Sequence, residues 1–355
     1  MSVVMPAPPN CAFASDNAAG AHPAVIDSII RANAGHALAY GADDETRACE
    51  RRFNELFDAD VTTLLTFNGT GGNITALTAL VRPADAIICT DWAHINVDET
   101  GAPERIVGAK LIDVVSPDGK LTPAAIESQE HLLGDQHHVQ PAVVSITQST
   151  ELGTIYSAAE IAAICDSAHR LGMRVHMDGA RIANAVAACG GTVEALRSLT
   201  IDAGVDVLTF GGTKNGMVGG EAVVFLNSQL GDRAKFVRKS VTQLPSKMRF
   251  IAAQFNALLH DDLWLDLAAH ANTMASLLWE RTKSISGVTF DVPPIVNSLF
   301  PVLPHEVIEP LRQWCFFWDW DPARDQVRWM TAWDTTEADV ERFAAGVSKI
   351  LATCN

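Results

Sequence analysis

The chain has 355 residues, of which 48% are hydrophobic and 19% charged, and its formal net charge is −16. This length exceeds that of one ordinary domain, and the composition is that of a compact globule, not of a fibrous or disordered chain. The acidic balance disfavours nucleic acid and anionic membrane surfaces as partners, since both would repel the protein, and no apolar run approaches the length of a membrane span.

The seven cysteines are scattered, odd in number and free of any C-x-x-C pair. We therefore expect reduced thiols in a cytoplasmic protein, with neither a disulfide framework nor a metal site. The first ten residues lack the basic and apolar stretches of a signal peptide, so we predict none.

Short apolar strands alternate with helices through the first two thirds of the chain. Glycine and capping residues delimit the helices. Helices are predicted at 44–57, 74–80 and 158–171, and strands at 86–90, 142–147, 174–177, 205–210 and 221–226. This alternation predicts an α/β fold with a mostly parallel sheet covered on both faces. Ligands bind such sheets beyond the carboxyl ends of the strands.

The pattern changes near Pro245. Long helices are predicted at 246–259 and 262–285, strands at 288–292, 297–302 and 326–331, and a capped final helix from about Thr335. We expect a large domain over residues 11–245 and a small α+β C-terminal domain over residues 246–355.

Two strand ends carry residues that suit one cofactor. Lys214 follows the strand in VLTFGGTKNG (207–216), and Asp178 ends the strand in MRVHMDGAR (173–181). A lysine can form an imine with an aldehyde cofactor, and an acid can pair with a pyridinium nitrogen. Each residue alone also fits a plainer structure, a loop lysine or a helix N-cap. Together they predict a pyridoxal phosphate (PLP) site.

Two further segments lie beside these strand ends. Glycines in TFNGTGGN (66–73) precede a helical run, so their N–H groups can face a phosphate; the alternative is an ordinary glycine-rich turn. His94 follows another strand, where an imidazole can stack on a pyridine ring or move protons; a hydrogen-bonded loop histidine is the alternative.

The C-terminal part offers two more candidates. Arg328 lies in a predicted strand, and its guanidinium can bind a substrate carboxylate at both oxygens, or form a surface ion pair with Asp325 or Asp334. The aromatic cluster WCFFWDW (314–320) is typical of a core or an interface, with an aromatic substrate pocket as the alternative.

In this order, the motifs resemble the L-threonine aldolase and β-eliminating lyase family of fold-type I PLP enzymes, from about Phe13 to Phe343. The DGAR and FGGTKNG segments resemble the phenylserine aldolase and low-specificity bacterial branch. The residues that carry the resemblance are Ser15-Asp16-Asn17, Tyr40-Gly41, Gly69-Thr70, His94, Asp178 to Arg181, Thr213-Lys214 and Arg328.

The resemblance implies roles for these residues. Lys214 would hold PLP covalently, Asp178 would pair with its pyridine nitrogen, and His94 would stack on its ring. Arg181 would lie near the ring hydroxyl and the substrate carboxylate. The phosphate would lie against Gly69, Thr70 and Gly71, and the carboxylate against Ser15 and Arg328. Tyr40 would approach the site of a neighbouring subunit, in a homotetramer built as a dimer of dimers.

The sequence departs from the family pattern at three places. Thr150 stands where many threonine-preferring relatives carry a second active-site histidine. The common Ser-Lys-Gly is Thr213-Lys214-Asn215, and the glycine turn has a glycine where alanine is common. These differences bear on the preferred substrate and on the group that takes the hydroxyl proton.

We therefore expect a PLP-dependent aldolase that cleaves β-hydroxy-α-amino acids such as L-threonine, L-allo-threonine or phenylserine into glycine and an aldehyde. His94, or a water that it holds, would remove the hydroxyl proton. A β-eliminating lyase or an aminotransferase would use the same lysine. A nucleotide-binding protein without enzymatic activity is a third reading, although neither G-x-G-x-x-G nor a P-loop motif occurs.

Overall fold

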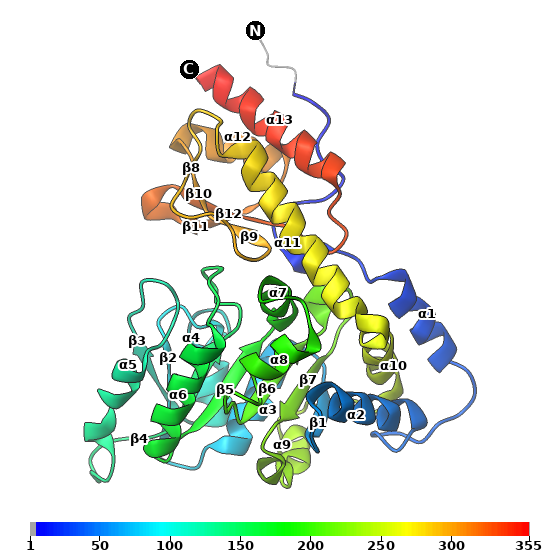
Figure 1. Cartoon of the computed structure of the whole chain (residues 1–355), viewed down its shortest axis with the longest axis vertical. Coiled ribbons are helices and arrows are strands. Elements are labelled where there is room, and N and C mark those ends of the chain that lie inside the picture. The colour runs from blue at the N-terminus through cyan, green and yellow to red at the C-terminus, as the bar shows by residue number, and fades with distance from the viewer. Residues whose placement is uncertain (1–4, 355) are drawn as a thin grey trace.

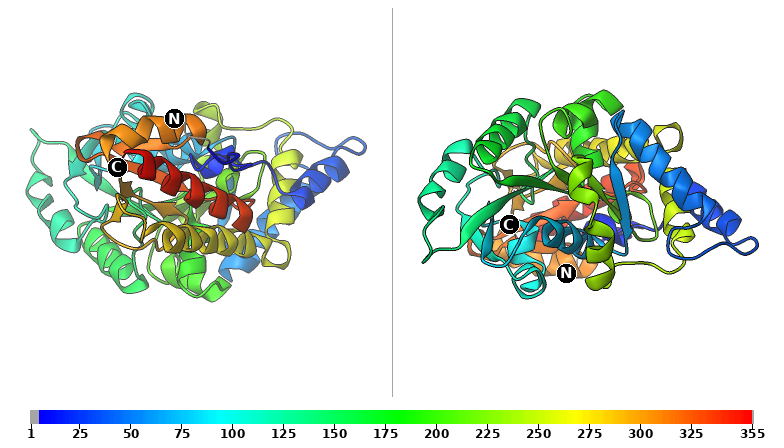
Figure 2. Two further views of the ribbon diagram at one scale, coloured as in Figure 1. Left: turned by 90° about the horizontal axis from the view of Figure 1, so that it is seen from above. Right: turned by 90° about the horizontal axis from the view of Figure 1, so that it is seen from below.

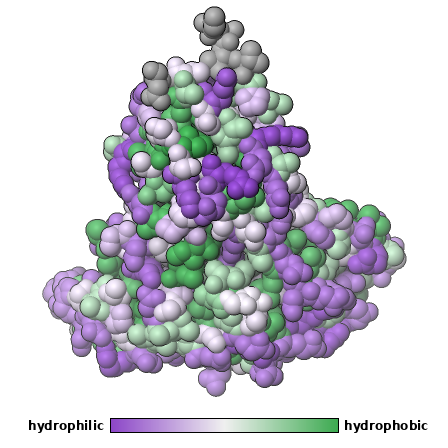
Figure 3. Space-filling model, turned by 45° about the horizontal axis from the view of Figure 1, so that its top comes forward, coloured by the Kyte–Doolittle hydropathy of each residue, from purple (hydrophilic) through white to green (hydrophobic). Residues whose placement is uncertain are grey.

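The computed structural model describes residues 5–354 and has two lobes (Figure 1). A broad lobe surrounds a seven-stranded sheet, and a smaller lobe surrounds an antiparallel sheet. The long helix α11 (Leu263–Thr282) runs from one lobe into the other. Figure 3 shows the small lobe rising from its broad base, with polar side chains over most of this face and apolar ones in clusters between them.

The large sheet has the order β1-β7-β6-β5-β4-β2-β3. Strand β7 is antiparallel to both neighbours, and every other pairing is parallel, so the prediction of a mostly parallel sheet is confirmed. The strands are β1 (Thr62–Thr66), β2 (Asp85–Thr90), β3 (Lys110–Val114), β4 (Gln140–Thr147), β5 (Arg174–Gly179), β6 (Val207–Gly211) and β7 (Glu221–Phe225).

Helices cover both faces of this sheet (Figure 2). Helices α3 and α9 bury Leu64, Val223 and Phe225 on one face, whereas α2, α6 and α8 lie over the main core on the other. The helices of this lobe are α1 (Pro23–Ala32), α2 (Asp44–Phe57), α3 (Gly69–Leu80), α4 (His94–Val97), α5 (Pro123–Glu127), α6 (Ala158–Arg170), α7 (Ile182–Ala188), α8 (Val193–Leu199), α9 (Ala234–Ser240) and α10 (Arg249–Leu258).

Local capping explains several helix ends. The side chain of Asp43 accepts the Thr46 N–H at the start of α2, and α6 begins with a reciprocal capping box between Ser157 and Glu160. Helix α3 begins at Gly69, not at Ile74 as predicted, because Asn68 caps it and the glycines form its first turn. The glycine-rich segment is therefore part of the helix and does not precede it.

The small lobe contains an antiparallel sheet with β11, β12, β10 and β8 in that order, and β9 paired with β12. The predicted strand at 297–302 is divided into two, and α12 and β11 were not predicted. The elements are β8 (Thr289–Phe290), β9 (Ser298–Leu299), β10 (Pro301–Val302), β11 (Trp318–Asp321), β12 (Gln326–Met330), α12 (His305–Trp314) and α13 (Glu337–Cys354).

The two main hydrophobic cores do not follow the chain order strictly. The large-lobe core includes Met248, Phe255 and Trp264, whereas Phe13 packs on Phe343 in the small-lobe core. The division into residues 11–245 and 246–355 stays a prediction. These contacts favour a boundary inside α11.

The cysteines described with their side chains, six in number, are free thiols. None of the helices in residues 5–354 is both long and apolar enough to cross a bilayer.

Candidate active site

The predicted site residues meet at the carboxyl ends of the parallel strands. A cavity of about 50 Å³ is lined by Gly69, His94, Asp178 and Lys214. A second cavity of about 180 Å³ shares His94, Arg181 and Lys214 with the first and adds Ser15 and Arg328. Tertiary folding thus brings together segments that lie far apart in the sequence.

Asp178 is buried at the end of β5, and both of its carboxylate oxygens are occupied. Oδ1 accepts the Ala180 N–H at 2.9 Å, and Oδ2 accepts the Asn73 side-chain amide at 2.7 Å. Burial alone would raise the pKa of Asp178, but the nearby His94 and these hydrogen bonds hold it below its usual value. The carboxylate therefore stays charged, and it does not cap α7, whose N-cap is Arg181.

Lys214 lies just past β6, in a single 3₁₀ turn (Thr213–Asn215). Burial, and then the charge of Arg181, lower the pKa of Lys214, which favours the neutral nucleophilic amine. At Gly211 a Cβ would lie 2.3 Å from the Ala180 carbonyl oxygen, so only glycine lets β6 approach β5 this closely. Glu221, which the sequence did not single out, accepts the Gly212 N–H at 2.7 Å and anchors the same turn.

The predicted phosphate-binding residues Gly69, Thr70 and Gly71 lie in the first turn of α3. The Asn68 side chain accepts the Gly71 N–H at 2.7 Å, and the helix N-terminus carries a partial positive charge. Gly69 lines the smaller cavity, whereas Thr70 and Gly71 are in the same turn but outside its lining. Gln243, which the sequence did not suggest, covers Gly71 and accepts the Phe67 N–H at 3.1 Å.

His94 begins α4 and is held by a buried acid. Its Nδ1 lies 2.9 Å from Glu99 Oε1, and the Asn73 amide donates to that same oxygen and to Asp178. The hydrogen bond with Glu99 is the main reason that the pKa of His94 is raised. Neither Asn73 nor Glu99 was predicted, because no local pattern distinguishes them.

Arg181 forms a bidentate ion pair with Asp16. Its Nε and Nη2 donate to the two carboxylate oxygens at 2.7 and 2.9 Å, and Asn297 donates to Asp16 as well. Ser15 lies next to this pair and lines the larger cavity. Asp16 was not predicted as a partner, since the two residues meet only in the folded chain.

Arg328 on β12 has no acidic partner among residues 5–354, so the alternative of an ion pair with Asp325 or Asp334 is wrong. Its Nη2 donates to the Ala14 carbonyl at 3.2 Å, and its guanidinium lies 5.1 Å from the centre of the Trp320 ring. Burial and the charge of Arg181 lower the pKa of Arg328 to about 10, so it stays cationic at neutral pH.

Of the remaining candidates, Tyr40 lies outside the two cavities, and the aromatic cluster 314–320 contributes one residue to them. Tyr40 is 55% exposed and lines neither cavity, so within one chain it takes no part in the site. The aromatic cluster divides: Phe317 packs in the small-lobe core, Trp318 is exposed, and Trp320 alone of the cluster lines the larger cavity.

These residues fit PLP. An ionised buried acid, a lysine of lowered pKa, and a helix N-terminus with glycines suit its pyridine nitrogen, aldehyde and phosphate respectively. Asp178, Lys214, His94 and Gly69 would hold it, because all four line the smaller cavity.

The chain is similar to known proteins in both sequence and structure. Residues 12–302 match the family model described as beta-eliminating lyase. The chain is 41% identical to the low specificity L-threonine aldolase of a Pseudomonas species (96% and 97% of the two chains) and 42% identical to that of Pseudomonas aeruginosa (93% and 94%). The structure of Leishmania major threonine aldolase superposes with a TM-score of 0.90 at 32% identity (96% and 99%).

The fold is that of the fold-type I PLP enzymes. Both the family model and the relatives extend over most of the chain, and the residues that suit the cofactor lie in one cavity. The chain therefore belongs to the β-eliminating lyase family, as a PLP-dependent lyase related to the threonine aldolases.

Proposed function

We propose that this protein cleaves β-hydroxy-α-amino acids into glycine and an aldehyde. The observation that supports this most is a pair of cavities that share lining residues: Lys214 and His94 line both, and Arg328 lines the larger one. The residues of the smaller cavity suit the reactive groups of the cofactor, and those of the larger one suit a small amino acid beside it. The relatives named low specificity L-threonine aldolases agree with this activity.

The residues divide the work. PLP, when bound, supplies an electron sink for the bond that breaks at Cα. Lys214 would provide the amine that holds the cofactor. Asp178, kept ionised by its neighbours, would pair with the pyridine nitrogen. His94 lies against the same slot and is oriented by Glu99.

The substrate carboxylate is held by Arg328 and Ser15. Of the two arginines that line the larger cavity, Arg328 has no carboxylate partner in the described chain, whereas Arg181 already pairs with Asp16. A guanidinium binds both oxygens of a carboxylate and so fixes its orientation. A carboxylate fixed in this way would orient the bonds at Cα and so favour cleavage of the Cα–Cβ bond.

A third cavity supports the proposal that the protein accepts substrates with an aryl or long β-substituent, of the phenylserine type. It measures about 260 Å³ and shares Trp320 and Ser298 with the substrate cavity. Its other walls are mainly apolar and include Leu152, Val292, Pro293, Pro294, Ile295 and Phe300. A ring placed there would leave water and contact Phe300 and Trp320, whose own rings lie 5.1 Å apart.

The test is product analysis of the PLP-loaded protein with L-threonine, L-allo-threonine and both phenylserine diastereomers. We expect equal amounts of aldehyde and glycine, and no product from Lys214→Ala. Keto acid or ammonia without glycine would point instead to a β-eliminating lyase or an aminotransferase.

A matched pair of tryptophans tests the aryl pocket. Trp320→Ala should lower kcat/KM for phenylserine more than for L-threonine, because it removes a wall of the third cavity. Trp318→Ala is the control, since Trp318 lies on the same strand and is 52% exposed. Equal losses for both substrates in Trp320→Ala would argue against the pocket.

We also propose a cytoplasmic homotetramer, a dimer of dimers with Tyr40 reaching the neighbouring site. Leu38 and Tyr40, 73% and 55% exposed, lie on one projecting loop and offer apolar surface for a second copy. Free buried thiols such as Cys49 and Cys89 suit a reducing compartment. Light scattering gives the assembly. Mixing Lys214→Ala with Tyr40→Ala subunits should restore activity if one site uses both chains.

A further inference from the structure

Glu151 lies between the smaller cavity, which we assign to the cofactor, and the larger cavity, which we assign to the substrate. It follows β4 and lines both cavities, as do His94 and Lys214. No sequence pattern singled it out, and it has no part in the functions assigned above.

Only one of the two carboxyl oxygens of Glu151 accepts hydrogen bonds. Oε1 accepts the His94 backbone N–H at 2.8 Å and the Thr147 hydroxyl at 2.9 Å. Oε2 is shut off from solvent and has no hydrogen-bond partner in residues 5–354. A buried carboxyl oxygen without a partner is costly, so Oε2 is the free acceptor of this carboxyl group, and the residue that carries it lines both cavities.

The protonation behaviour of Glu151 suits proton transfer. Burial, with the negative charge of Asp178 adding to it, raises the pKa of Glu151 to about 7. A group with a pKa near the working pH exchanges protons most effectively. The titratable or charged groups that face it are Cys89, His94, Tyr156, Asp178, Arg181 and Lys214.

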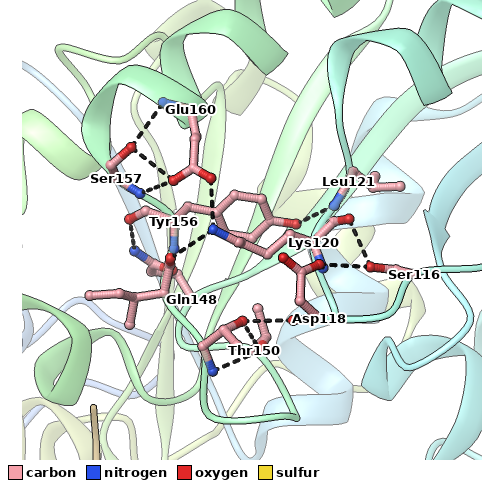
Figure 4. Close-up of polar contacts among 11 residues, drawn as sticks. Ser116, Asp118, Lys120, Leu121, Gln148, Thr150, Tyr156, Ser157 and Glu160 are labelled. Atoms are coloured by element: carbon pink, nitrogen blue, oxygen red, sulfur yellow. Dashed lines mark hydrogen bonds and ion pairs between the residues drawn. The ribbon is translucent and has the colours of Figure 1, made fainter. Parts of the chain in front are cut away.

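The other groups in this wall are less suited to accept a proton. The Thr150 hydroxyl is already bonded to the Thr154 hydroxyl at 2.7 Å, and Thr154 donates in turn to the Asp118 carbonyl (Figure 4). The hydrogen bond with Glu99 raises the pKa of His94, which favours the protonated ring as a donor. Asp178 is kept ionised by the nearby His94 and by its own hydrogen-bond donors, so it is a poor proton acceptor.

Hydrogen bonds fix the segment 148–156, which includes Glu151 (Figure 4). The Gln148 side chain exchanges two hydrogen bonds with the backbone of Tyr156, at 2.9 and 3.0 Å. The Tyr156 hydroxyl in turn accepts the Leu121 N–H at 2.7 Å, and Thr154 Oγ1 donates to the Asp118 carbonyl at 2.7 Å. A fixed segment holds the carboxyl group in place, which proton transfer at one substrate atom requires.

We propose that Glu151 is the acid–base group that exchanges the proton of the substrate β-hydroxyl, an assignment that rests on the aldolase function proposed above. In cleavage, the O–H bond breaks and the proton passes to the Glu151 carboxylate. The C–O bond becomes the aldehyde C=O, the Cα–Cβ bond breaks, and its electron pair stays with Cα. Cα then takes up a proton to give glycine, so no oxidant, reductant or co-reactant is needed.

Two reactions of the PLP-loaded protein separate this role from a structural one. Cleavage of L-threonine or phenylserine needs the β-hydroxyl proton to leave, whereas exchange of the glycine α-proton with D₂O does not. Glu151→Gln keeps the shape of the side chain but cannot accept a proton. We expect it to lower kcat for cleavage roughly 10²- to 10⁴-fold while glycine exchange proceeds as in the unchanged protein.

The pH profile gives a second readout. Since the deprotonated carboxylate accepts the proton, kcat should rise with pH through about 7 and then level off, and Glu151→Gln should lose this limb. Glu151→Asp should keep a limb with lower kcat, which preserves the test if the Gln variant does not fold. Glu130→Gln, at an exposed position outside all three cavities, is the control.

The outcomes are distinct. Cleavage at the unchanged rate in Glu151→Gln, or a parallel loss of cleavage and glycine exchange, overturns the assignment. Absence of aldehyde from the unchanged protein would instead refute the aldolase function itself.

Discussion

Asp16 and Arg181, 165 positions apart in the chain, form a bidentate ion pair with N–O distances of 2.7 and 2.9 Å. The pair ties the N-terminal segment to the strand end that carries Asp178, and Asn297 from the small lobe donates to the same acid. Three distant parts of the chain thus meet beside the substrate cavity. The site is complete only when both lobes are folded together.

Replacing Asp16 should destabilise the protein. Asp16→Asn leaves the buried Arg181 cation without its carboxylate, and we expect the free energy of unfolding to fall by about 3 kcal/mol. Urea denaturation measures this, with the exposed Asp27→Asn as control. Burial alone would raise the pKa of Asp16, but Arg181 holds it below its usual value. The stability from the pair is therefore present above the unfolded pKa of about 4 and lost as pH falls through the folded one, so the difference between the proteins should shrink in acid.

Removing the charge of Glu99 should lower the pKa of His94. Because the hydrogen bond with Glu99 is the main cause of the raised pKa of His94, Glu99→Gln should bring it back toward 6.5. A histidine of raised pKa adds stability that is present below its unfolded pKa and lost as pH rises through the folded one. The two proteins should therefore differ most in stability in mild acid. NMR titration of His94 checks this, with the exposed Glu104→Gln as control; an unchanged His94 pKa would contradict it.

Two glycines of the predicted phosphate-binding turn should respond differently to a methyl group. A Cβ at Gly71 would lie 2.2 Å from the Gln243 side chain, which must move and give up the Phe67 N–H. A Cβ at Gly69 meets nothing within 4 Å. We expect Gly71→Ala to lower stability by about 1 kcal/mol and Gly69→Ala to have little effect on it. Thermal unfolding of the two PLP-free proteins measures the difference, and equal melting temperatures would show that Gln243 moves without cost.

Replacing Arg328 by a side chain with fewer hydrogen-bond donors should weaken substrate binding. Arg328→Lys keeps the charge but loses one of two hydrogen bonds to a carboxylate, so KM should rise roughly tenfold, equivalent to about 1.4 kcal/mol. Arg342→Lys, on the same lobe, exposed and outside all three cavities, is the control. Steady-state kinetics with L-threonine tests this, and an unchanged KM would move the carboxylate to another residue.

Much of the large lobe could be predicted from short-range patterns. Helix α2 has the predicted bounds because Asp43 caps it, and five of the strands fall on the predicted apolar runs. Strands β1 and β3 were missed, since Thr62–Thr66 and Lys110–Val114 mix polar and apolar residues without regular alternation. Helix α12 was missed as well, because Pro310 lies inside it.

The sequence by itself determined the fold class and the placement of Asp178, Lys214 and His94, because parallel strands in an α/β sheet bring the residues that follow them to one edge. Only the tertiary structure decided which groups these residues meet. Long-range packing brings Asp16 to Arg181, Glu99 to His94, and Glu151 between the two cavities. No local signal in the sequence encodes these contacts. The partners of a buried charge are set by which segments exclude water around it, and that is a property of the folded chain.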